Sequence, residues 1–64
     1  MKYKAVELKS KGGWAVKRIG SHGSNWLSFS HEYDGLYWYG TTRWVKIYPS
    51  KGAALSQIAS LGIL

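Results

Sequence analysis

The first half of the chain alternates between apolar and polar residues with the two-residue period of a β-strand. In residues 2–9 one side carries Lys4, Val6 and Leu8, and the other carries Tyr3, Ala5, Glu7 and Lys9. This alternation predicts a strand with one partly apolar face. Residues 14–19 and 26–33 also alternate and predict two further strands. For the strand at 14–19 the pattern does not decide which of its two faces is buried.

Turn-forming residues separate these segments and determine how neighbouring strands would pair. Residues 20–25 predict a polar loop. Asp34-Gly35 predicts a two-residue type I′ hairpin turn, because both central positions of such a turn need positive φ. In that register Tyr33 would lie opposite Leu36.

The stretch from Leu36 to Tyr48 concentrates aromatic and β-branched residues, which favour strands. A turn at 40–42 divides the stretch, so it predicts a fourth strand and a last strand at 43–48. In the last strand we expect Val45 and Ile47 to face inward. The residues expected to face outward are Trp44, Lys46 and Tyr48.

After Pro49 the period of the apolar residues becomes helical. Ser50 is a favourable N-cap, and residues 51–61 predict a helix with one apolar face. That face consists of Ala54, Leu55, Ile58 and Leu61. A short helix this apolar needs a surface to lie on, and the sheet is the available surface.

The whole pattern predicts one α+β domain over residues 1–64. Its expected architecture is an antiparallel β-meander of three to five strands, followed by one C-terminal helix packed on one sheet face. The strand residues expected in the core are Val6, Leu8, Leu27, Phe29, Trp38, Val45 and Ile47.

The amino-acid composition limits the classes of function and partner that fit this chain. Nine Lys and Arg against three Asp and Glu give a net charge of +6, which favours nucleic acid or an acidic protein as the partner. There is no cysteine, no catalytic motif and no cofactor motif, so we expect a non-enzymatic protein without metal or cofactor. The N-terminal residues lack the apolar core of a signal peptide and no apolar run reaches membrane length. We therefore expect a cytoplasmic protein with no membrane partner.

The sheet face that the helix leaves uncovered is expected to combine aromatic rings with cations. Nucleic-acid bases stack on aromatic rings, and cations beside the rings neutralise phosphates. The pattern thus predicts a nucleic-acid-binding face. Its expected residues are Lys17, Arg18, Trp26, Tyr37, Tyr39, Arg43, Trp44, Lys46 and Tyr48. A basic N-terminal cluster at residues 2–11 fits either phosphate contact or protection of an edge strand by lysines.

The same residues fit two other functions. An acidic groove on a host nucleic-acid-processing protein would match the basic aromatic face, which makes the chain an inhibitor. A flat aromatic face can also be buried in a structural homodimer. The leading hypothesis is a small basic nucleic-acid-binding protein.

Two resemblances bear on these hypotheses. The strand Gly13-Trp14-x-Val16-Lys17-Arg18, followed by further strands and a short helix, resembles the layout of arm-type DNA-binding domains of tyrosine recombinases and of the plant AP2 type. This likeness implies a sheet that lies in a DNA groove, and it assigns no residue roles. The segment from Trp44 to Ala54 looks like a strand-to-helix passage common in small bacteriophage proteins. Those proteins often inhibit host RNA polymerase, restriction enzymes or CRISPR complexes, which implies the cytoplasm of a phage host as the location.

Overall fold

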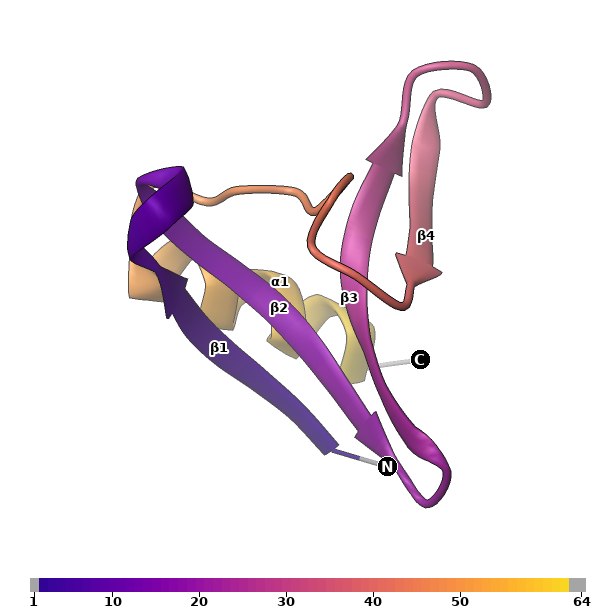
Figure 1. The fold of residues 1–64 in the computed structure, drawn as a ribbon. Helices are drawn as coiled ribbons and strands as arrows, with labels where there is room; N and C mark the ends of the chain where they lie inside the picture. The colour runs from indigo at the N-terminus through magenta and orange to yellow at the C-terminus, as the bar shows by residue number, and fades with distance from the viewer. Residues whose placement is uncertain (1, 63–64) are drawn as a thin grey trace.

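A computed structural model describes residues 2–62 as a four-stranded antiparallel sheet and one α-helix (Figure 1). The elements are β1 (Lys2–Leu8), the short 3-10 helix η1 (Lys9–Lys11), β2 (Gly13–Gly20), β3 (Gly23–Ser30), β4 (Gly35–Tyr39) and α1 (Lys51–Gly62). Each strand pairs with the next one along the chain, in the order β1-β2-β3-β4. This arrangement confirms the α+β meander and C-terminal helix that the sequence predicts.

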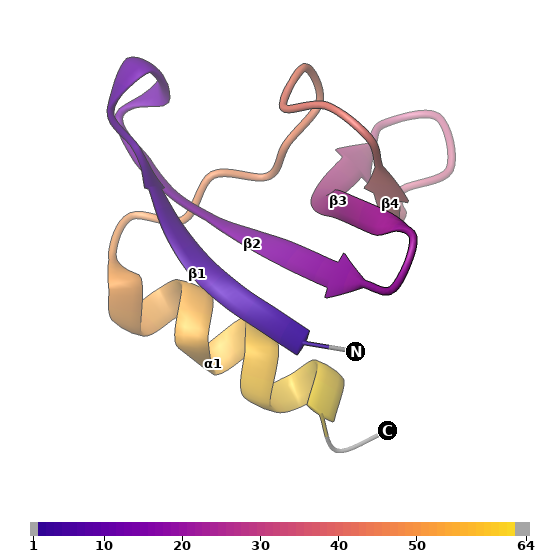
Figure 2. The same ribbon diagram turned by 60° about the horizontal axis from the view of Figure 1, so that its bottom comes forward.

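The helix covers only part of one face of the sheet. Figure 2 shows α1 lying beneath β1 and β2, while β3 and β4 extend beyond it. Its start is fixed by Ser50, whose Oγ accepts a hydrogen bond of 3.1 Å from the backbone N–H of Ala53. This bond satisfies one of the N–H groups that the first helical turn leaves without a partner, and it confirms the predicted cap.

The connection between β3 and β4 is wider than the sequence predicts. Residues 31–34 form it, and Ser30 pairs with Gly35. The predicted type I′ turn is wrong because Asp34 has a positive φ of 49° but Gly35 does not. Leu36 consequently pairs with Phe29 rather than with Tyr33. The shift is four residues, an even number, so the side chains that remain within β3 and β4 keep their predicted faces.

Residues 43–48 do not form the regular strand that the sequence predicts. The strands β2 and β3 pair only near their shared turn and then diverge, and the segment before α1 crosses the open end (Figure 1). Trp14 and Tyr48 exchange two backbone hydrogen bonds of 2.9 and 2.7 Å, and Lys46 N–H donates to the Leu27 carbonyl at 3.0 Å. The segment therefore fills the gap between two diverging strands.

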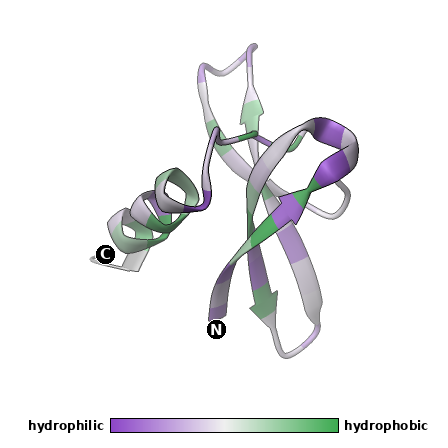
Figure 3. Ribbon diagram, turned by 90° about the vertical axis from the view of Figure 1, so that its left-hand side faces the viewer, coloured by the Kyte–Doolittle hydropathy of each residue, from purple (hydrophilic) through white to green (hydrophobic). Residues whose placement is uncertain are grey.

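The core lies between α1 and the sheet face on which the helix packs. Its buried members are Val16, Leu27, Tyr48 and Ala54, and the partly buried residues packed on them are Ala5, Trp14, Trp38, Ala53, Ile58 and Leu61. Figure 3 shows hydrophobic residues on the helix and on the strands of the sheet. Because Val16 belongs to this core, the face of β2 that carries Val16 is the buried one, a point that the sequence pattern did not decide.

Tyr48 is a correction to the predicted core. Its side chain is 8% exposed rather than outward-facing, and its hydroxyl donates a 3.1 Å hydrogen bond to Gln57 Oε1 on α1. Burial raises the pKa of the Tyr48 phenol above its ordinary value. Tyr48 is buried because β2 and β3 diverge, so that the segment filling the gap between them turns residue 48 toward the helix.

Other predicted core residues lie outside the buried cluster. The helix packs on the side of β1 that carries Ala5, not on the side that carries Val6 and Leu8. The small side chain of Ala5 lets the helix approach the strand closely. Leu55 of α1 is 46% exposed, so its place on the apolar helix face is also wrong. The predicted core residues that are half-buried and lie outside the core cluster are Val6, Leu8, Phe29, Val45 and Ile47.

Candidate nucleic-acid interface

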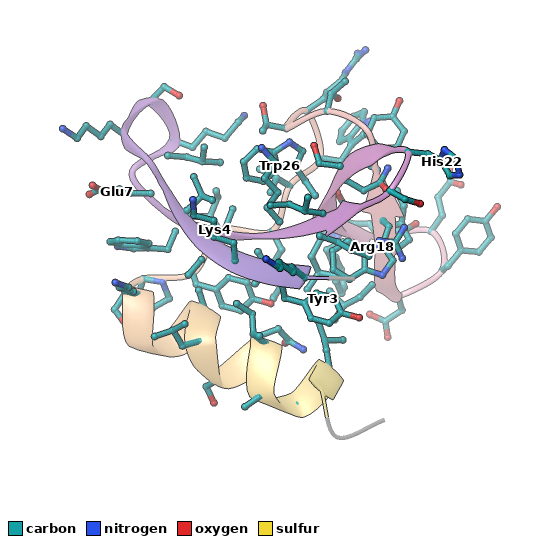
Figure 4. All side chains as sticks on the ribbon, turned by 90° about the horizontal axis from the view of Figure 1, so that it is seen from below. Tyr3, Lys4, Glu7, Arg18, His22 and Trp26 are labelled. Atoms are coloured by element: carbon teal, nitrogen blue, oxygen red, sulfur yellow. The ribbon has the colours of Figure 1, made fainter. Side chains whose placement is uncertain are left out.

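One row of side chains crosses all four strands on the sheet face away from α1. Lys4 on β1 lies opposite Lys17 on β2, Lys17 lies opposite Trp26 on β3, and Trp26 lies opposite Tyr39 on β4. Residues directly opposite one another in an antiparallel sheet project from the same face. We call Lys4, Lys17, Trp26 and Tyr39 the lysine–aromatic row. Figure 4 shows Lys4 and Trp26 on the side of the sheet away from the helix.

Lys17 and Trp26 are in contact within the row, and the row remains partly accessible. Lys17 Nζ lies 5.2 Å from the centre of the Trp26 ring, which is a cation–π distance. Next to the row, Tyr37 and Tyr39 meet edge to face with ring centres 6.0 Å apart. Tyr39 is 40% exposed, and Trp26 and Tyr37 are half-buried. The row is thus a partly exposed aromatic surface with two ammonium groups at one end.

The positive charge of the row has no acidic neighbour on its own face. Glu7 lies opposite Trp14 and so projects from the helix-covered face, and Glu32 and Asp34 lie in the connection between β3 and β4. The row therefore presents an unneutralised cationic surface beside aromatic rings.

The predicted site residues do not all share one face. Four of them gather at the row: Lys17, Trp26, Tyr37 and Tyr39. The other five lie elsewhere: Arg18, Arg43, Trp44, Lys46 and Tyr48. Sequence reasoning omitted Lys4, because alternation placed it with Val6 and Leu8 on the expected core face. The signal that identifies Lys4 is its register with Lys17, which follows from the short turn between β1 and β2.

A second surface lies beyond the end of the helix. An open groove runs along the β3–β4 hairpin, and its lining residues are Phe29, Ser30, His31, Glu32, Tyr33, Gly35, Leu36, Tyr37 and Trp44. Leu36 and Trp44 are 44% and 52% exposed. The Arg43 guanidinium lies 5.1 Å from the Trp44 ring centre, and Lys46 Nζ lies 5.5 Å from that of Phe29. We call this surface the hairpin groove.

Arg18 belongs to neither surface. It lies opposite Tyr3 on β1 and opposite Asn25 on β3, so it projects toward the helix-covered face near the β2–β3 turn. Figure 4 shows Arg18 and Tyr3 away from the side of the sheet on which Lys4 lies. Its side chain is therefore separated from Lys17 by the thickness of the sheet.

Comparison with protein-family models, with curated proteins and with solved structures found no match to this chain. In residues 2–62 no helix has the length and hydropathy needed to cross a bilayer. The same residues contain no group of three or more His, Cys, Asp or Glu side chains that could hold a metal ion.

Proposed function

We propose that this chain is a non-enzymatic protein that binds single-stranded nucleic acid through the lysine–aromatic row. The observation that supports the proposal is the order of residues across the sheet. Two lysines stand at one end of the row and two aromatic rings at the other. A strand laid along the row would stack bases on Trp26 and Tyr39 while its phosphates meet Lys4 and Lys17.

Base stacking and counterion release both favour the binding of a single-stranded nucleic acid to the row. Each base stacked on an aromatic ring contributes about 1–3 kcal/mol to binding. Each phosphate that a lysine neutralises releases condensed counterions, and this release strengthens binding at low salt. Duplex DNA keeps its bases stacked on one another, so it offers no free base faces to Trp26 and Tyr39. We therefore expect tighter binding of single strands than of duplexes.

The four tryptophans allow a direct test by NMR. Trp26 lies in the row, whereas Trp14 packs on the core under α1 and Trp44 lines the hairpin groove. Titration with a single-stranded oligonucleotide that has a 5′-hydroxyl end should move the indole N–H resonance of Trp26. The resonances of Trp14 and Trp44 should stay in place. Movement of Trp44 without Trp26 would reject the row as the binding surface.

A second candidate function is supported by the hairpin groove. It combines the exposed apolar side chains of Leu36 and Trp44 with the cations Arg43 and Lys46. These features suit an acidic partner protein, such as the nucleic-acid-binding surface of a host enzyme. Under this alternative Trp44→Ala abolishes capture of the partner. Under the nucleic-acid proposal Trp44→Ala leaves oligonucleotide affinity unchanged, and Trp26→Ala lowers it about tenfold or more.

A further inference from the structure

Arg18 is held rigidly by neutral partners. One guanidinium N–H, on Nη2, donates a 3.2 Å hydrogen bond to Asn25 Oδ1. The guanidinium carbon lies 4.4 Å from the centre of the Trp38 ring, and that ring in turn stacks on Tyr3 with centres 5.8 Å apart. These contacts fix the long side chain in one position, so little conformational entropy would be lost when it binds a ligand.

The acidic side chains of the part of the chain that the structure describes lie away from Arg18. Glu7 lies four residues along β1 from Tyr3, the residue opposite Arg18, and Glu32 and Asp34 lie in the β3–β4 connection, at the other end of β3 from the β2–β3 turn. The structure gives the guanidinium one hydrogen bond, although this group carries five N–H donors. A fixed guanidinium with free donors matches the oxygen spacing of a phosphate group, which it can bind through two parallel hydrogen bonds.

The surface beside Arg18 is hollow, and its lining consists of polar residues and glycines. The hollow is lined by Arg18, Gly20, Ser21, His22, Gly23, Ser24 and Asn25, which span the β2–β3 turn. Two glycines keep side chains out of the hollow, and the two serine hydroxyls and the His22 ring supply further hydrogen-bonding groups. Figure 4 shows Arg18 and His22 on the same side of the molecule, at the end of the sheet that holds this turn.

We infer that the β2–β3 turn binds one phosphate group, with Arg18 as its principal donor. The site is separate from the lysine–aromatic row and does not require it. Two sources of phosphate fit this chemistry: a free phosphate or nucleotide, and the terminal phosphate of a strand bound on the row. The second source rests on the proposed function. Lys17 is three residues from Gly20 at the end of β2, or about 10 Å along the strand. A nucleic-acid strand that leaves the row and passes around this end of the sheet can therefore reach the hollow.

The first test uses inorganic phosphate and NMR. Saturable shifts are expected in the indole N–H of Trp38, which lies under the guanidinium, and in the backbone amides of residues 21–25. Trp26 should not respond, because it reports on the row. Arg18→Lys keeps the charge but loses the paired donors, and should weaken phosphate binding about tenfold or more. Lys11→Gln, which removes a charge far from the turn, should leave phosphate affinity unchanged.

A second variant keeps the test valid if Arg18→Lys disturbs the fold. Ser21→Asp changes an exposed residue of the turn and places a carboxylate in the hollow, so it should abolish phosphate binding. Phosphate shifts that never saturate, or that persist with native affinity in Ser21→Asp, would overturn the inference.

A final comparison identifies the source of the phosphate. If the terminal phosphate of a strand is the ligand, a 5′-phosphorylated oligonucleotide binds more tightly than its 5′-hydroxyl form, and Arg18→Lys removes the difference. Equal binding of both forms, together with saturable binding of inorganic phosphate, supports the site with a free phosphate or nucleotide as its ligand. The Trp26 response to the hydroxyl form tests the proposed function separately, so the failure of one proposal is distinguishable from the failure of the other.

Discussion

Lys4 and Lys17 lie directly opposite each other on β1 and β2, on the sheet face away from the helix. Like charges in this position destabilise an antiparallel pair, and no acidic side chain on that face offsets the repulsion. The pair therefore costs stability in the free protein. A bound polyanion would remove that cost, which makes the pair a feature expected of a binding surface rather than of a purely structural sheet.

Reversing one of these charges should separate stability from binding. Lys4→Glu replaces the repulsion with an attraction across the strands, so the free energy of unfolding should rise by about 0.2–1 kcal/mol, while affinity for a single-stranded oligonucleotide falls. Chemical denaturation and fluorescence anisotropy measure the two effects. Lys11→Glu makes the same change in η1, where no lysine lies opposite, and should not raise stability. A loss of stability in Lys4→Glu would contradict the assigned register.

Gly13 is required by the segment that fills the gap between β2 and β3. A Cβ atom at this position would clash with Ile47 Cγ2 and would lie 2.7 Å from the Tyr48 carbonyl oxygen. Gly13→Ala should therefore lower the free energy of unfolding by about 1–3 kcal/mol, the usual cost of overpacking. Gly40→Ala is the matched control, because a Cβ there meets nothing within 4 Å. Equal unfolding midpoints in urea for the two variants would contradict the packing of residues 47 and 48.

The N-cap of α1 gives a prediction about helix stability. Ser50→Ala removes the acceptor of the Ala53 N–H and should cost about 0.5–2 kcal/mol, as the removal of a cap does. Ser50→Asp restores an acceptor and should recover most of this stability. Ser56→Ala changes an exposed serine inside the helix and should be neutral or slightly stabilising. The unfolding midpoint at a constant m-value measures all three variants, and a neutral Ser50→Ala would rule out the cap.

Tyr48 makes stability depend on pH in the alkaline range. Burial raises the pKa of its phenol in the folded protein, whereas the unfolded chain has the ordinary value of about 10. The unfolded chain thus loses the proton first, so the contribution is complete below pH ~10 and decreases as the pH rises through the folded pKa.

Tyr48→Phe tests this dependence. The variant loses the hydrogen bond to Gln57, so near pH 7 it should be less stable than the native protein by about 0.5–1.5 kcal/mol. Above pH ~10 the difference should narrow, because phenylalanine has no proton to lose. Tyr33→Phe, at a position that is 84% exposed, should match the native protein throughout. A difference for Tyr48→Phe that stays constant up to pH ~11, beyond the ordinary tyrosine pKa, would contradict the assignment.

The elements that follow from local periodicity are the ones that the sequence predicts well. The two-residue alternation identifies β1 and β2, and Ser50 with the helical period identifies α1. The faces of β3 and β4 are also predicted correctly although the turn is not, because the pairing moved by an even number of residues. These properties depend on neighbours along the chain and on the pleat of the backbone.

The properties that escaped prediction depend on tertiary arrangement. Tyr48 is buried because β2 and β3 diverge and leave a gap that the segment before α1 fills, and no pattern within that segment encodes the gap. The predicted site residues lie on different surfaces for the same reason. Trp44 and Lys46 belong to the segment that fills the gap, and this segment runs away from the row. Lys4 joins the site only through its register with Lys17, which becomes apparent once the strands are paired.

The salt dependence of oligonucleotide binding tests the central claim most directly. We expect the native protein to bind a labelled single-stranded oligonucleotide with an affinity that falls linearly on a log–log plot against salt. The double variant Lys4→Gln/Lys17→Gln should show a slope smaller in magnitude by about 1.4, or ~0.7 for each phosphate that the variant no longer neutralises. The variant Lys9→Gln/Lys11→Gln, which removes the same amount of charge from η1, should keep the native slope. An unchanged slope in the Lys4/Lys17 variant, or no saturable binding by the native protein at low salt, would contradict the account.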